Sequence, residues 1–225
     1  MATAAKNAGR IVKNSVAKSP PARKPQARSG ETRLLLLAAA RKIFVRDGYE
    51  RAQIDEIARA AGRTKGAVYG HFKDKEDLFL ALFEERSKKD MGAVVARMGN
   101  GTDQAANLAI FRSFYRDLAS DKSWAILTLE FKLYALRYPE VRRRLRQAYR
   151  QTRPRDLEQQ MQKVFGTTVS SPELSIEGCV AALGPILCGL VLESLLEPGL
   201  FSASKLPVYL ETLFDTLIAS KLQSS

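Results

Sequence analysis

The stretch AGRTKGAVYGHF, residues 61–72, concentrates the side chains of this chain that could do chemistry. It holds the only histidine, His71, together with the hydroxyl of Thr64, the ammonium of Lys65 and the phenol of Tyr69. An imidazole can act as a general acid or base or ligate a metal, whereas ammonium and hydroxyl groups donate hydrogen bonds to phosphate. These residue types leave three kinds of site open: a catalytic loop, a metal site and a surface that binds a partner.

Catalysis and metal binding are the weaker alternatives. No acidic or nucleophilic partner flanks His71, and a lone histidine is more often structural than catalytic. With 1 histidine and 2 cysteines, Cys179 and Cys188, the chain has too few ligands for a structural zinc cluster. We therefore expect no catalytic residue, no metal site and no cofactor, and we do not expect an enzyme.

The charge balance favours a polyanionic partner. Lys and Arg number 36 against 24 acids, which gives a net charge of +12. Residues 1–30 hold seven basic residues, no acid and no apolar periodicity, so we predict a disordered basic arm there. A solvated tail without function and a transit peptide are the alternatives for this arm.

Hydropathy gives an expectation about location. The N-terminus shows no apolar core of a secretory signal, and the longest uncharged apolar run, 178–192, is shorter than the roughly 20 residues that span a bilayer. We expect a cytoplasmic, nucleoid-associated protein with no membrane partner.

The elements that must position the stretch are helices. Apolar residues recur at helical spacing throughout, and no segment shows the alternation of a strand. Asp74 and Asp77 suit the N-cap and third position of one helix. We predict an all-α fold of about nine helices, over 32–48, 54–61, 65–72, 74–98, 103–120, 122–137, 140–165, 173–196 and 204–222.

The short helix at 65–72 has one side without side chains. At 100° per residue, Val68 and Phe72 define its inward side, and Gly66 and Gly70 occupy the opposite side. Each glycine costs an exposed helix roughly 1 kcal/mol relative to alanine. A partner that approaches this side closely would offset that cost. The phosphate backbone beside a DNA groove is such a partner. The alternative is a glycine-weakened surface turn.

Three short helices in 40 residues have the spacing of a helix-turn-helix. The segment from Thr32 to Phe83 resembles the DNA-binding domain of the TetR family of bacterial transcriptional regulators. The resemblance is carried by Ala39-Ala40, Phe44, Gly48-Tyr49, Ile57-Ala58, Ala61-Gly62, Lys65-Gly66, Tyr69, His71-Phe72, Lys75-Glu76 and Leu78. It implies a helix-turn-helix domain over 31–84 and a helical ligand-binding and dimerisation domain over 85–225.

The resemblance also implies roles for individual residues. Thr64 would cap the recognition helix and meet phosphate, Lys65 would reach a base edge or phosphate, and Tyr69 would pack on phosphate. The full set expected at DNA is Gln53, Arg63, Thr64, Lys65, Gly66, Ala67, Tyr69, Gly70, His71, Lys73 and Lys75. Three of these depart from the family pattern: Arg63 replaces Val or Ile, Gln53 replaces a better cap, and Gly70 replaces a larger residue.

The larger domain has no comparable motif. A ligand pocket is expected among aromatic and polar residues of the middle helices, namely Phe111, Phe114, Tyr115, Trp124, Thr128, Glu130, Phe131 and Tyr134, although residues at this spacing are more often core. A dimer interface is expected on the last two helices, at Val180, Leu183, Leu187, Val191, Leu210, Leu213, Phe214 and Leu217, or these residues form an ordinary core. The arginine-rich run 142–155 is a solvated face or the mouth of an anion pocket.

Together these features predict a ligand-responsive repressor. It would bind a palindromic double-stranded DNA operator as a homodimer and be released by a small-molecule effector. The alternatives are a nucleoid-type architectural protein, an activator of the same fold, and a helical enzyme or scavenger that uses only the C-terminal domain.

Overall fold

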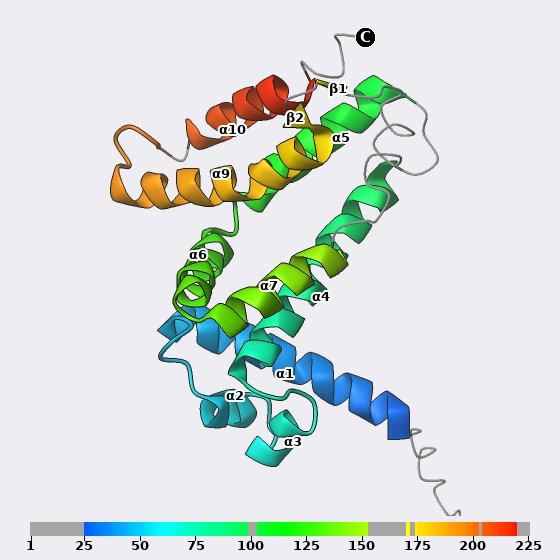
Figure 1. The fold of residues 1–225 in the computed structure, drawn as a ribbon, viewed down its shortest axis with the longest axis vertical. Helices are drawn as coiled ribbons and strands as arrows, with labels where there is room; N and C mark the ends of the chain where they lie inside the picture. The colour runs from blue at the N-terminus through cyan, green and yellow to red at the C-terminus, as the bar shows by residue number, and fades with distance from the viewer. Residues whose placement is uncertain (1–24, 99–102, 153–169, 172–173, 203, 220–225) are drawn as a thin grey trace, which may run out of the picture.

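The computed structural model describes residues 25–98, 103–152, 170–171, 174–202 and 204–219. The first four helices are α1 (Pro25–Asp47), α2 (Ile54–Ala60), α3 (Lys65–Tyr69) and α4 (Lys75–Met98). They are followed by α5 (Gln104–Leu118), α6 (Lys122–Arg137), α7 (Pro139–Thr152), α9 (Ile176–Leu196), α10 (Leu206–Phe214) and the π-helical turn η1 (Asp215–Ala219) (Figure 1). The predicted all-α fold is confirmed.

One local feature differs from the expectation. A two-stranded antiparallel ladder pairs β1 (Ser170–Ser171) with β2 (Leu174–Ser175). Strands of two residues are too short to show a period of two in the sequence. The second half of the helix predicted over 140–165 lies outside the described residues.

Helix α1 begins earlier than the sequence indicated. Its first residue is Pro25, so residues 25–30 are helical and do not belong to the predicted disordered arm. Proline is well suited to a first helical turn because its missing N–H has no partner there in any case. The first turns of α1 extend beyond the other helices at this end of the molecule (Figure 1). The rest of the arm, residues 1–24, lies outside the described residues.

The described helices bury two apolar clusters. The first cluster contains residues of the four helices α1, α2, α3 and α4 and of α6 and α7. Helix α6 contributes Leu127, Phe131 and Ala135, and α7 contributes Val141, Leu145 and Ala148. The second joins the far end of α4 to α5, the start of α6, α9 and α10. The segment 31–84 therefore shares its core with α6 and α7, and α4 and α6 each contribute to both clusters.

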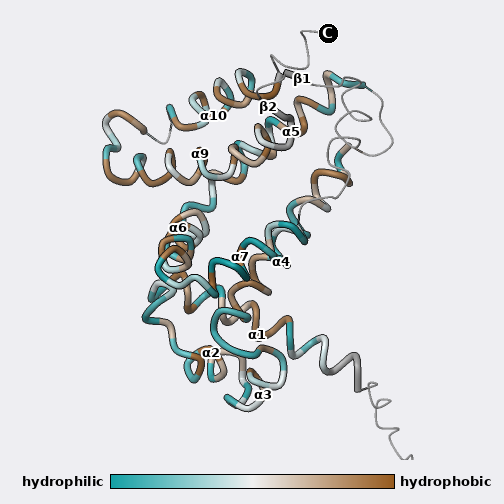
Figure 2. The backbone as a smooth tube through the Cα atoms, viewed as in Figure 1, coloured by the Kyte–Doolittle hydropathy of each residue, from teal (hydrophilic) through white to brown (hydrophobic). Residues whose placement is uncertain are grey.

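Helix α9 is apolar on most of its surface, whereas α7 is mostly hydrophilic (Figure 2). By length and composition, the segment Gly178–Leu196 of α9 could cross a membrane. A core helix passes the same test, and here Leu183, Leu187 and Val191 are buried within the second cluster. Helix α9 packs against α6 and α10, while its residues Leu192, Leu195 and Leu196 stay exposed.

Candidate nucleic-acid interface

The turn between α2 and α3 has the geometry of a helix-turn-helix. Gly62 has a φ of +63°, a conformation that glycine adopts without strain. Arg63 N then donates to Ala58 O at 2.9 Å, which closes the C-terminus of α2. Val68 and Phe72 are buried, so the inward side expected for α3 is confirmed.

The start of α3 is fixed by Thr64. Its Oγ1 accepts a hydrogen bond from Ala67 N at 3.2 Å, which confirms the predicted cap. Gln53 stands at the equivalent position of α2 but makes no side-chain cap bond. The Arg63 side chain is exposed and donates to Gly62 O at 3.0 Å.

Most of the residues expected at DNA are exposed, and they belong to α3 and the loops beside it. Tyr69 is 50% exposed, which is unusual for so large an aromatic ring. Ala67, His71 and Lys75 are half-buried. The exposed members are Gln53, Arg63, Thr64, Lys65, Gly66, Tyr69, Gly70 and Lys73.

Lys75, which was expected at DNA, also makes contacts within the protein. Its Nζ donates to Glu50 O at 2.8 Å and to Ala52 O at 3.2 Å, and it lies 4.9 Å from the centre of the Tyr49 ring. Burial lowers the pKa of Lys75. In this arrangement the ammonium group stabilises the loop between α1 and α2.

His71 lies at the junction of the N-terminal helices and α7. It lines a cavity of about 270 Å³ that also includes Arg33, Asp77 and Arg144. Within the described part of the chain, no group of three His, Cys, Asp or Glu side chains could hold a metal ion. The position of His71 beside α3 is compatible with the phosphate contact that the resemblance implies.

The start of α4 is anchored to α7. Asp74 Oδ1 accepts from Asp77 N at 2.7 Å, which confirms the predicted helix start, and Asp77 Oδ2 accepts from Lys73 N at 3.0 Å. Arg144 of α7 donates to both oxygens of Asp74, at 2.9 and 3.0 Å. Burial alone would raise the pKa of Asp74, but the Arg144 guanidinium and the Asp77 amide hold it below its ordinary value.

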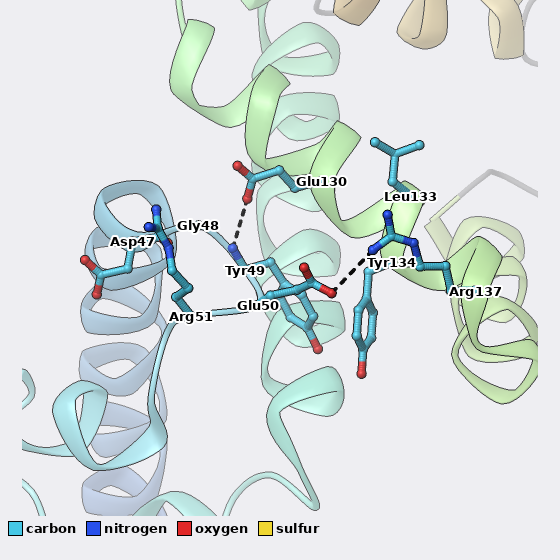
Figure 3. A pocket seen from close by; sticks show the side chains of 9 residues that line it. All are labelled: Asp47, Gly48, Tyr49, Glu50, Arg51, Glu130, Leu133, Tyr134 and Arg137. Atoms are coloured by element: carbon cyan, nitrogen blue, oxygen red, sulfur yellow. Dashed lines mark hydrogen bonds and ion pairs between the residues drawn. The ribbon is translucent and has the colours of Figure 1, made fainter.

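Helix α6 holds the loop between α1 and α2 from the other side. Glu130 accepts a hydrogen bond from Tyr49 N at 2.9 Å, and Gly48 beside it has a φ of +78° (Figure 3). Tyr134 donates to Glu76 of α4 at 2.8 Å. Gly48, Tyr49, Glu130 and Tyr134 line a cavity of about 320 Å³. Glu130 and Tyr134, expected to orient a ligand, therefore join α6 to the helix-turn-helix.

Sequence reasoning missed a further junction at Asp121. Its Oδ1 caps α6 by accepting from Trp124 N at 3.1 Å. Its Oδ2 accepts from Arg41 of α1 at 2.5 Å and from Arg86 of α4 at 2.7 Å. An aspartate directly before a predicted helix was a visible signal for the cap, but nothing local indicated the two arginines.

The eight residues expected in a ligand pocket do not come together. Trp124, Phe131 and Tyr134 pack in or against the first cluster, and Phe111, Phe114 and Tyr115 pack in or against the second. Thr128 donates to Trp124 O at 2.8 Å. These side chains are divided between the two clusters because α6 passes from one core to the other.

The expected dimer residues are mostly buried within one chain. Leu183, Leu187, Val191, Leu210 and Phe214 pack α9 on α10, while Val180, Leu213 and Leu217 are half-buried. These residues form core, which was the alternative. The exposed apolar side chains of this region are Leu192, Leu195, Leu196, Leu200, Val208 and Tyr209, and we call this set the α9–α10 patch.

Comparison with known proteins gives the same assignment for the N-terminal helices. The family model of the bacterial regulatory proteins of the tetR family matches residues 36–82. The regulator AcrR of Shigella flexneri is 46% identical over 63 residues, which are 28% of this chain and 29% of AcrR. The repressor AcnR of Corynebacterium efficiens is 32% identical over 107 residues, 48% of this chain and 52% of AcnR. The chain thus spans about a third to a half of the curated relatives it matches.

Solved structures match over more of the chain. The fatty acid degradation regulator FadR from Bacillus halodurans has a TM-score of 0.64 at 21% identity and covers 91% of this chain and 98% of its own. A transcriptional regulator from Rhodococcus sp. Rha1 has a TM-score of 0.59 at 26% identity, covering 85% and 96%. The fold is shared along most of the chain, and residues 36–82 match the helix-turn-helix domain of the tetR family of bacterial regulatory proteins.

Proposed function

We propose that this protein is a ligand-responsive transcriptional repressor that binds a palindromic operator as a homodimer. The observation that carries the proposal is the exposed surface of α3, where Thr64 caps the helix and the side chains of Lys65 and Tyr69 face solvent. Hydroxyl, ammonium and phenol groups exposed along a short helix suit phosphates and base edges in a major groove. The repressor AcnR among the relatives supports the sign of regulation.

Two substitutions on α3 test the contact with DNA. Lys65→Ala and Tyr69→Ala remove one charge and one ring from exposed positions, so each should lower operator affinity by roughly ten- to a hundredfold while the melting temperature changes little. Fluorescence anisotropy with a labelled duplex measures the affinity, and thermal unfolding checks the fold. Unchanged binding by both variants would remove α3 from the interface.

The α9–α10 patch is the proposed dimer interface. Leu196 and Leu200 are 64% and 57% exposed, and a cluster of leucines open to water favours burial in a second copy. Two-fold symmetry would then place two α3 helices about 34 Å apart for successive turns of the major groove.

Introducing a charge into this patch should dissociate the dimer. Leu196→Glu would bury a carboxylate at the interface, and sedimentation velocity should show a monomer at concentrations where the wild type is a dimer. Leu136→Glu on α6 is the matched control, because Leu136 is 63% exposed but lies outside the patch. A dimeric Leu196→Glu variant would place the interface elsewhere.

The effector is proposed to act through the second cluster. The Bacillus subtilis FadR structure contains stearoyl-CoA, and a regulator from Saccharomonospora viridis contains choline, which supports a small-molecule effector without fixing its class. Because α4 and α6 belong to both clusters, a shift among α5, α9 and α10 would be transmitted to the helix-turn-helix. The effector must bind the two states with different affinity to change DNA binding.

Selection of bound duplexes from a random pool tests the function as a whole. We expect a two-fold symmetric site with half-sites about one helical turn apart. An architectural DNA-binding protein would return no preferred sequence. Transcription in vitro from a promoter with the selected site then distinguishes a repressor from an activator.

A further inference from the structure

The lysine expected to contact DNA is paired with a carboxylate on the preceding helix. Lys65 Nζ lies 3.0 Å from Asp55 Oδ1 and 3.2 Å from Asp55 Oδ2. Asp55 belongs to the first turn of α2 and Lys65 is the first residue of α3. Both side chains are 55% exposed, so the pair lies on the same open surface as Gln53 and Tyr69.

An exposed carboxylate at this place affects DNA binding in two ways. Its charge repels any phosphate that approaches, whatever the sequence, and this weakens non-specific binding. It also occupies part of the Lys65 ammonium, which has three N–H donors and can give one to Asp55 while another meets an acceptor on DNA. The pair with Asp55 thereby fixes the direction of the Lys65 ammonium. Only a DNA acceptor that lies in this direction forms a hydrogen bond strong enough to offset the repulsion between Asp55 and phosphate.

The neighbouring acid on α2 has another role. Glu56 pairs with Arg46 of α1, so it joins α2 to α1 and does not touch α3. The hydrogen bond and charge of Asp55 raise the pKa of Lys65, so the ammonium group stays protonated. Asp55 and Glu56 thus provide two adjacent carboxylates of which one holds the expected DNA-contacting lysine.

We propose that Asp55 is a specificity-determining residue of the DNA-binding surface and that it acts by positioning Lys65. This inference rests on the proposed function. Asp55 lowers the affinity for DNA of arbitrary sequence more than the affinity for the operator, and so it sets the ratio between the two.

The test measures two affinities for each variant of the full chain. Binding to the selected operator and to a scrambled duplex of the same length is followed by fluorescence anisotropy between 50 and 200 mM salt, a range in which phosphate contacts change affinity strongly. Asp55→Asn should strengthen binding to the scrambled duplex about fivefold, because one repulsive charge is lost, and change operator binding by less than about twofold, because there the same gain is offset by the loss of Lys65 positioning. Glu56→Gln, the control, should leave the ratio unchanged.

A double-mutant cycle separates positioning from simple repulsion. In a Lys65→Ala background, Asp55→Asn should change the ratio much less, since the residue through which it acts is gone. Asp55→Glu keeps the charge and should restore most of the wild-type ratio. Asp55→Ser replaces Asp55→Asn if thermal unfolding shows that the amide destabilises α2.

Three results would overturn the inference: an unchanged ratio in Asp55→Asn, an equal change in Glu56→Gln, or an equal effect of Asp55→Asn with and without Lys65. A wild type that prefers no sequence would instead overturn the proposed function, and this is visible before any variant is made. The two failures are therefore distinguishable.

Discussion

Gly48→Ala should be the most destabilising single methyl addition in the helix-turn-helix. The substitution forces an alanine into a φ of +78°, which costs about 1–2 kcal/mol. Its Cβ would also lie 3.1 Å from Glu130 Oε2, so the carboxylate must move and weaken its bond to Tyr49 N. Loss of a hydrogen bond to a charged group adds about 1.5–3 kcal/mol. We expect a melting temperature roughly 5–12 °C lower, measured by thermal unfolding.

Two matched variants separate these contributions. Gly62→Ala imposes similar strain at a φ of +63° but has no atom within 4 Å of the new Cβ, so it should cost only the conformational part. Glu130→Ala removes the carboxylate that Gly48→Ala would displace. The loss of stability in the double variant of Gly48→Ala and Glu130→Ala should therefore be smaller than the sum of the losses in the two single variants. Equal destabilisation by Gly48→Ala and Gly62→Ala would show that the Glu130 contact contributes nothing.

The contact between Glu130 and Tyr49 N shows that α6 helps to hold the helix-turn-helix. Glu130 of α6 binds the loop after α1, and Arg144 of α7 binds the start of α4. The helix-turn-helix also shares its apolar core with α6 and α7. A boundary drawn at residue 84 falls within the continuous helix α4. We infer that the helix-turn-helix moves together with α6 and α7 as one unit.

The features that the sequence predicted correctly are local. Thr64 and the pair Asp74 and Asp77 cap helices through residues three positions away, so a short stretch contains the whole signal. The spacing of Val68 and Phe72 likewise fixes the inward side of α3. These elements place the candidate DNA-binding surface without knowledge of the rest of the chain.

The features that the sequence missed join distant segments. Glu130 lies 81 residues from Tyr49, and Arg144 lies 70 residues from Asp74. A carboxylate or guanidinium on a helix shows that it will seek a partner, but not which one. The same holds for α9, whose apolar residues surround the helix, so the sequence could not tell which side packs on α10 and which side stays exposed.

Gly70→Arg should strongly weaken operator binding while the protein stays folded. Gly70 ends α3 with a φ of −72°, which every residue tolerates, and a Cβ there would lie 3.4 Å from Gly66 O. At Gly66 the nearest atom to a new Cβ is 3.8 Å away. Neither glycine is therefore required inside the protein, and we propose that their lack of side chains allows close approach of the groove wall.

A graded series tests this explanation. Gly66→Ala should raise the melting temperature slightly, as helix propensity predicts, and weaken operator binding by a few fold, whereas Gly70→Arg should weaken it by about tenfold or more despite its added charge. Gly92→Ala on the exposed face of α4, with no atom within 4 Å of its new Cβ, controls for the gain in helix stability. If the bare side of α3 did not contact DNA, the guanidinium of Gly70→Arg would lie in solvent and strengthen binding by attracting phosphates. The sign of the change in affinity therefore decides whether the bare side of α3 is in contact with DNA.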